Sequence, residues 1–199
     1  MKKINKAYSI LGVIKRNFIH VDKNTFILLY KAMVRPHLEY ANSVWCPYKK
    51  GDIESIEKVQ KRATKLVICL KNLSYVERLK QLKLPTLKYR RLRGDMIEVF
   101  KIVHNYYDPG ASVKFKPNPL GITRGNKLKL QKFTCHYNLR KYSFCSRVIN
   151  IWNSLPDHVV EADSINKFKS RLDKYWTNQD IVYNYDCDLT GTGGLPVCM

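Results

Sequence analysis

The chain has 199 residues, 45% of them hydrophobic, which is enough for one domain or two small ones with a real core. Its formal net charge is +20, far from the mixed-sign balance of an ordinary soluble enzyme. Repulsion of that size disfavours the compact state unless a polyanion is bound, so nucleic acid is the first expected partner. A membrane partner is disfavoured, because no apolar run approaches ~20 residues and no lipidation signal accompanies a lysine-rich tail.

The cysteines indicate neither a disulfide framework nor a metal site. There is no C-x-x-C pair, and Cys135, His136 and Cys145 lack a fourth ligand at zinc-finger or zinc-knuckle spacing. The chain starts with a short apolar patch, but Lys15 and Arg16 follow it where a secretory cleavage site would stand. We therefore expect reduced thiols in an intracellular compartment, cytoplasm or nucleus, and neither metal nor cofactor.

The first forty residues are expected to form helices. From Lys2 to Phe18 apolar residues recur at helical spacing among basic ones. Asp22 stands where an N-cap would, ahead of a second helix. That helix should end before Pro36, because proline disfavours helical geometry in the residue before it. A further short helix is expected over residues 37–42.

The next helix begins at Asp52 and carries the first group of predicted phosphate contacts. Its apolar residues fall on one face when about 100° is counted per residue. The opposite face carries Lys58, Lys61, Arg62 and Lys65. The simplest alternative is an amphipathic helix whose charges are only solvated, but such faces usually mix both signs. Acids are missing from the last three turns here, which favours contact with phosphates.

A second group of predicted phosphate contacts stands at the start of a long helix. Ser74 is the expected cap of a short helix ending at Leu82, and Pro85 suits the first turn of a long one running to about Tyr106. The start of this helix carries Lys88, Arg90, Arg91 and Arg93. Positive charge opposes the helix dipole there, and a bound phosphate would neutralise the cluster.

The remaining sequence is divided by a segment rich in proline and glycine, residues 108–126, which predicts a loop or hinge between two lobes. Residues 127–134 begin with alternating lysine and leucine, as expected of a short extended segment. Arg140 and Lys141 lead into a helix with a clean apolar face, and together with Arg147 they form the third group of predicted phosphate contacts.

Ser164 is expected to cap a last helix that runs to Trp176, and a disordered tail is expected over residues 177–199. The patterns together predict a mostly α-helical protein. Its expected parts are a helical bundle over residues 1–70, a basic connector over 71–107, the hinge, a C-terminal helical lobe over 127–176, and the tail.

No enzyme constellation is present in the sequence. There is no P-loop, no G-x-S-x-G, no H-E-x-x-H and no pair of aspartates such as two-metal polymerases and nucleases need. The five histidines are scattered, without a carboxylate or thiol at ligand spacing. We expect the chain alone to catalyse nothing.

Several runs in one order resemble the C-terminal region of reverse transcriptases of non-LTR (LINE-type) retrotransposons of the jockey-like group. The first runs are LYKAMVRPHLEY at 29–40, VWCP at 44–47 and IEKVQKRATK at 56–65. ERL at 77–79, LPTL at 84–87 and RRLRGDMI at 90–97 follow. The last are RVIN at 147–150, WNSLP at 152–156 and FKSRLD at 168–173. Each run is weak alone, but together they cover residues 2–176.

The resemblance implies the part of the polymerase that follows the palm: a helical thumb to about residue 70 and a connector beyond it. The catalytic aspartates of the family, including the Tyr/Phe-Ala-Asp-Asp turn, are absent, so polymerase activity is not carried over. In such enzymes the thumb holds the primer–template duplex by its backbone. The expected partner is therefore RNA or an RNA–DNA duplex, bound largely without regard to sequence.

Two alternatives remain open. The chain could be a docking module whose apolar helices pack on a polymerase palm and fingers segment or on another protein. It could also be a degenerate element product without a selected function. The sequence gives neither the oligomeric state nor a preference between RNA and DNA.

Overall fold

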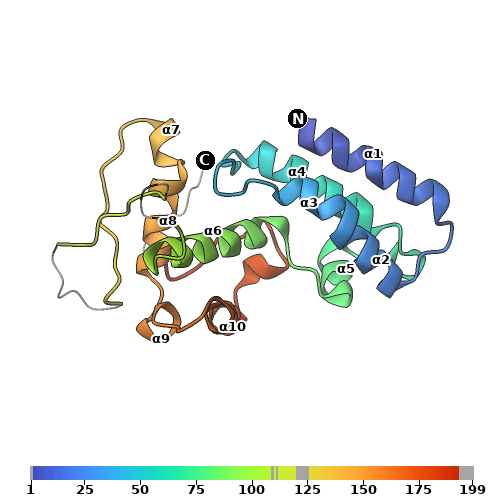
Figure 1. Ribbon diagram of the computed structural model, residues 1–199. Coiled ribbons are helices and arrows are strands. Elements are labelled where there is room, and N and C mark those ends of the chain that lie inside the picture. Colours follow the sequence, from blue (N-terminus) through green and yellow to red (C-terminus); the bar gives the residue numbers. More distant parts are fainter. Residues whose placement is uncertain (1, 109, 111, 120–125, 193–199) are drawn as a thin grey trace. The chain divides into compact units, whose positions relative to one another are not determined.

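Residues 2–108, 110, 112–119 and 126–192 are described by a computed structural model of the protein (Figure 1). This part of the chain is mostly α-helical, as predicted. Its β pairing is limited to two isolated bridges, Val21 with Val67 and Pro117 with Leu130.

The chain divides into two compact units. Within the described residues, unit 1 comprises 2–42, 47–91 and 181–187, and unit 2 comprises 43–46, 92–180 and 188–192. The division falls inside one helix, α6 (Leu87–Val103), and not in the loop that was expected to be a hinge. Residues 71–91 join unit 1 because Leu79, Leu82 and Leu84 belong to its hydrophobic core.

Unit 1 is a helical bundle built around α1, which packs against both α3 and α4 (Figure 1). Apolar residues at helical spacing, such as Ala7, Leu11 and Ile14 on α1, supply its core. The elements are α1 (Lys2–Asn17), α2 (Lys23–Leu29), the π-helix η1 (Tyr30–Val34), α3 (Arg35–Glu39), α4 (Lys50–Thr64), the 3₁₀-helix η2 (Ile68–Leu70), α5 (Tyr75–Leu82) and the start of α6.

Pro36 does not end the second helix, contrary to expectation. The backbone stays in the right-handed helical region at Val34 and Arg35, and helical turns continue through α3. A proline inside an α-helix loses one hydrogen bond, and its ring clashes with the carbonyl four residues earlier. The wider π turn before it accommodates the proline, with the Arg35 N–H donating to the Tyr30 carbonyl five residues back.

Three predicted helix caps are confirmed. The Asp22 carboxylate accepts hydrogen bonds from the backbone N–H groups of residues 24 and 25 at the start of α2. Ser74 and Glu77 form a reciprocal capping box on α5. The Ser164 hydroxyl accepts from the Lys167 N–H at the start of α10.

Unit 2 surrounds the later turns of α6, whose Met96, Val99 and Phe100 are fully buried. Phe168 stacks on Phe100 with ring centroids 4.3 Å apart, and Trp152 is also buried against Phe168. The other helices of this unit are α7 (Asn138–Lys141), α8 (Phe144–Asn153), α9 (Asp157–Val160) and α10 (Ile165–Tyr175).

The predicted extended segment is present in unit 2 and is held on α8. The Leu128 carbonyl accepts a hydrogen bond from the Trp152 indole N–H at 2.8 Å. The Asn153 side-chain amide exchanges two hydrogen bonds with the backbone of Leu130, each 2.8 Å. One asparagine thereby satisfies both backbone groups of a residue, as a neighbouring strand would.

The expected disordered tail needs correction, because residues 181–187 fold back onto unit 1. Ile181 is fully buried, and its carbonyl accepts from the Thr86 hydroxyl at 2.6 Å. The Thr86 N–H donates to the carbonyl of Val182, the last residue of the 3₁₀-helix η3 (Asp180–Val182). Residues 193–199 of the predicted tail lie outside the described residues.

Candidate nucleic-acid interface

The predicted cationic face of α4 is exposed to solvent. The opposite side of this helix is embedded in the core of unit 1 and fixes its orientation. The embedded side chains are Ile56, Glu57, Val59, Gln60, Ala63 and Thr64. All four predicted cations, Lys58, Lys61, Arg62 and Lys65, are exposed. We call these four side chains the α4 surface.

The positive charge of the α4 surface is only partly neutralised. The Lys58 amine lies 3.2 Å from the Glu54 carboxylate, an exposed pair one helical turn apart. Lys61, Arg62 and Lys65 form no ion pair with any residue that the structure describes. The Arg62 guanidinium lies over the Tyr8 ring of α1, 5.7 Å from its centroid. The sequence has no acid between Lys58 and Glu77, so the charge extends past the helix.

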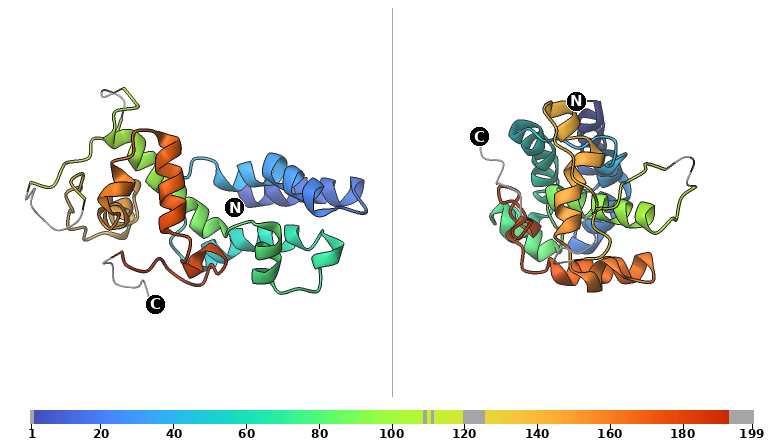
Figure 2. Two further views of the ribbon diagram at one scale, coloured as in Figure 1. Left: turned by 90° about the horizontal axis from the view of Figure 1, so that it is seen from below. Right: turned by 90° about the vertical axis from the view of Figure 1, so that its left-hand side faces the viewer.

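The last turns of α1 and α4 point toward the same end of unit 1. The two helices run in the same direction (Figures 1 and 2), and the segments that follow them meet at the Val21–Val67 bridge. Lys15 and Arg16 stand in the last turn of α1 and are exposed. Basic residues at helix C-termini also interact favourably with the dipole, so part of this placement has a purely structural explanation.

The predicted phosphate site at the start of α6 is wrong. The Glu57 carboxylate of the protein itself occupies that place, accepting from the Lys88 N–H at 2.9 Å, while the Thr86 hydroxyl accepts from the Tyr89 N–H. Glu57 is buried, so an internal anion replaces the phosphate that was expected to meet the helix dipole. The local sequence shows no sign of this contact, because Glu57 lies 31 residues before Lys88.

Two arginines of the same cluster, Arg90 and Arg91, also bind groups of the protein within unit 1. Arg90 forms a bidentate ion pair with Glu39, whose second contact is 3.0 Å. Arg91 is only 4% exposed and donates to the Leu38 carbonyl at 2.8 Å. The prediction that these two side chains bind phosphate is therefore corrected: they fasten α6 to the end of α3.

Arg93 and Arg147, both predicted phosphate contacts, form bidentate ion pairs inside unit 2. Arg93 pairs with Asp173 of α10 at 2.5 and 2.7 Å. Arg147 pairs with the buried Asp95 at 2.9 and 3.0 Å. Both charges are already matched by a carboxylate of the protein in a strong bidentate pair, so the structure does not support these two predictions.

Lys88 is likewise used within the fold. Its amine donates to the carbonyls of Tyr185 at 3.1 Å and Cys187 at 2.7 Å. It thus holds the returning segment 181–187 on unit 1. The structure leaves Arg140 and Lys141 of α7 exposed, with the Lys141 amine 5.6 Å from the centroid of the Tyr142 ring.

A buried polar network under α4 was missed by sequence reasoning. Glu57 accepts a hydrogen bond from the Tyr75 hydroxyl at 2.8 Å. The Gln60 side chain accepts from the Tyr30 hydroxyl at 2.5 Å and donates to the Pro85 carbonyl. Burial raises the pKa of Glu57 and also that of Tyr75, whose ionised form would face the carboxylate. One feature of the sequence could have indicated this network: Glu57 is a glutamate on the apolar face of an amphipathic helix.

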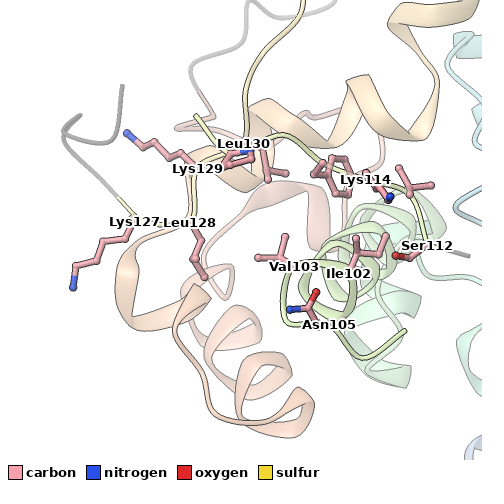
Figure 3. Close-up of a pocket in the computed structure, with 12 residues that line it drawn as sticks. Ile102, Val103, Asn105, Ser112, Lys114, Lys127, Leu128, Lys129 and Leu130 are labelled. Carbon is pink, nitrogen blue, oxygen red and sulfur yellow. The ribbon is translucent and has the colours of Figure 1, made fainter. Parts of the chain in front are cut away.

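Unit 2 contains a mainly apolar pocket of about 450 Å³ beside the end of α6 (Figure 3). Its wall includes Ile102, Val103 and Leu128. In Figure 3 the amino groups of Lys127 and Lys129 point away from the pocket, whereas Leu128 points into it. The pocket therefore receives the apolar side of the extended segment and leaves the lysines on its outer side.

The described residues contain no group of three or more His, Cys, Asp or Glu side chains that could hold a metal ion. Among the same residues, no helix combines the length and apolar character needed to cross a membrane. No protein-family model, curated protein or solved structure is significantly similar to this chain.

Proposed function

We propose that this chain binds the phosphate backbone of RNA or of an RNA–DNA duplex through the α4 surface. One observation carries the proposal: four cations project from a helix whose other face is fixed in the core, and only Lys58 has an acid partner among the described residues. Side chains mounted in this way meet a polyanion without further ordering of the backbone. Contacts of this kind are to phosphates, so binding is largely independent of sequence.

The runs that resemble jockey-like reverse transcriptases extend the proposal. In this reading the chain is the thumb and connector of such an enzyme, and it holds the primer–template without performing chemistry. The bundle of unit 1 and the exposed cations of α4 support that role. An open reading frame for the palm, with its catalytic aspartates, in the genomic DNA directly upstream would support the family; an unrelated upstream sequence would reject it.

Salt dependence tests the binding proposal directly. Four phosphate contacts predict a slope of about −3.6 for log affinity against log salt, or a loss of about a hundredfold between about 50 and 200 mM salt. Replacing Lys61, Arg62 and Lys65 with alanine should flatten the slope by about 2.7. Fluorescence anisotropy with a labelled RNA–DNA hybrid measures both values.

The charge-matched control removes three positive charges from another helix. Lys167, Lys169 and Lys174 lie on α10, and their replacement with alanine lowers the net charge by the same amount. This control should keep nearly the original slope. An equal change in both triple variants would mean that bulk charge, and not the α4 surface, attracts the duplex. Salt-insensitive binding by the unmodified chain would reject the proposal.

A second candidate function, docking to another protein, is favoured by exposed apolar side chains on α2, on η1 and at the residue that follows α3. Leu28 is 70% exposed and Tyr40 71%, with Met33 between them in sequence. A docking module should bind a hydrophobic dye as an isolated chain, and Leu28→Glu should reduce that binding. A monomer that unfolds cooperatively and binds no dye would count against docking.

A further inference from the structure

The stretch between Asp108 and Asp157 is the longest acid-free part of the sequence and contains nine lysines and arginines. Among the described ones, Arg147 pairs with Asp95 and Lys127 lies 3.5 Å from Glu161. Lys132, Arg140 and Lys141 are exposed and form no ion pair with the residues that the structure describes. These three side chains therefore present positive charge with no acid partner among the described residues.

The segment that leads to these cations is held in place by hydrogen bonds. Residues 116–118 and 129–131 pair as a short antiparallel ribbon, through the Asn118 N–H to the Lys129 carbonyl at 2.9 Å and the Gln131 N–H to the Lys116 carbonyl at 2.8 Å. Trp152 and Asn153 fasten the second segment of the ribbon to α8. The chain then runs on through Lys132 to α7.

Two aromatic rings on this path face solvent. Tyr137 is 79% exposed and Phe133 is 42% exposed. Between them the Cys135 sulfur lies 3.5 Å from the Ser146 hydroxyl of α8, which keeps the middle of the path on the unit. Single exposed rings are common on protein surfaces; what distinguishes these two is that exposed cations stand close to them in the chain, Lys132 beside Phe133 and Arg140 three residues after Tyr137.

Tyr137 and two cations lie within a single helical turn. The Tyr137 carbonyl accepts from the backbone N–H groups of Arg140 at 3.1 Å and Lys141 at 2.9 Å. A flat ring is thereby placed within one turn of two positive side chains that can reach phosphates. Single-stranded nucleic acids are bound by this combination, because bases stack on the ring while cations follow the backbone. A duplex offers no unstacked base for the ring.

We propose that the path from Lys132 to Lys141 is a binding site for single-stranded nucleic acid. A base stacks on Tyr137 and a neighbouring base on Phe133, while Lys132, Arg140 and Lys141 contact phosphates. An acidic protein or an anionic membrane would use the charges but gain nothing specific from base-sized planar stacking. The site lies on a different unit from the α4 surface and does not depend on duplex binding there.

The experiment compares two strands of equal charge, using the full chain. One is an oligothymidylate of about 12 nucleotides, and the other is an abasic deoxyribose-phosphate strand of the same length. The unmodified protein should bind the strand with bases about tenfold more tightly, the contribution of one to two stacked bases. Tyr137→Ala should remove most of that difference, and Tyr137→Trp should keep it. An oligouridylate of the same length shows whether RNA or DNA is preferred.

The controls separate this site from the proposed function and from misfolding. Tyr175→Ala removes another exposed tyrosine, on α10, and should leave the difference intact. The triple alanine variant of the α4 surface should also keep the difference in affinity between the two strands. The two proposals can therefore fail independently of each other. Tyr137 is mostly exposed, and unchanged thermal unfolding of Tyr137→Ala would confirm an intact fold. Equal affinity of the unmodified chain for both strands would overturn the inference, as would equal competition by polyglutamate or acidic lipid vesicles.

Discussion

The C-terminal half of α4, with its cap residue Lys65, and the start of α6 each carry four cations within about two helical turns, yet the two regions have opposite surroundings. The cations of α4 face solvent, and Lys58 alone has a nearby acid among the described residues. The cations of α6 meet carboxylates or carbonyl oxygens of the protein itself, such as Glu39, Asp173 and the Leu38 carbonyl. Local density of positive charge therefore does not identify a phosphate-binding surface; the positions of the acids do.

The difference follows from how each helix is packed. One side of α4 is open, so its cations remain hydrated at little cost. The turns of α6 are packed within their own units, with Tyr89 and Met96 buried, so a cation on α6 loses water and requires a partner. Such a partner is supplied by distant segments of the chain.

The largest effect should come from breaking the most buried pair of α6. Asp95→Ala leaves the Arg147 guanidinium without its bidentate carboxylate in a mostly buried position. We expect the free energy of unfolding to fall by about 3–5 kcal/mol. Urea denaturation, followed by a probe in unit 2 such as Trp152 fluorescence, measures this change. Glu54→Ala removes the acid partner of Lys58 on α4 and should change the free energy of unfolding by less than about 0.5 kcal/mol. Similar losses for both variants would remove the distinction between the two regions.

A smaller effect is expected at Glu57, the buried acid on the inner side of α4. Glu57→Ala leaves the Tyr75 hydroxyl and the Lys88 N–H without their acceptor, which should cost about 1.5–3 kcal/mol in urea denaturation. An unchanged stability would show that the start of α6 does not need this internal anion.

The pH dependence of stability reports on the same carboxyl. Burial raises the pKa of Glu57 in the folded state, so the unfolded chain loses this proton first as pH rises. Stability should therefore decrease from about pH 4.3, the ordinary glutamate value, up to the raised pKa, and stay lower above it. Glu57→Gln should lack this component in urea denaturation across that range. Identical pH profiles for the two proteins would contradict the assignment.

The smallest effect belongs to the half-exposed pair of Arg93 and Asp173. A double-mutant cycle with alanine at both positions should give a coupling energy of about 1 kcal/mol, above most surface pairs because the contact is bidentate. The same cycle on Lys58 and Glu54 of α4 should give about 0.3–0.5 kcal/mol, as for other exposed helix pairs. A reversed order would mean that the cations of α6 are no better paired than those of α4.

Local signals predicted much of the secondary structure. Asp22, Ser74 and Ser164 cap helices through contacts within three residues, so their roles are visible in the sequence alone. The alternation of Lys127 and Leu128 likewise predicted an extended segment. Pro36 misled because the π turn before it, which accommodates the proline, has no signal in the local sequence pattern. Among the candidate site residues, those of α4 were placed correctly on the exposed face, and those at the start of α6 were not.

The sequence by itself determined that this protein is a mostly helical, strongly basic chain with an amphipathic α4, because helical periodicity and capping act within a few residues of the chain. Only the tertiary structure decided which cations stay free for a polyanion. The acids that neutralise Arg90, Arg93 and Arg147 lie about 50 to 80 residues away in sequence. Electrostatic pairing depends on distance in space and on desolvation, and neither quantity exists until distant segments have packed together.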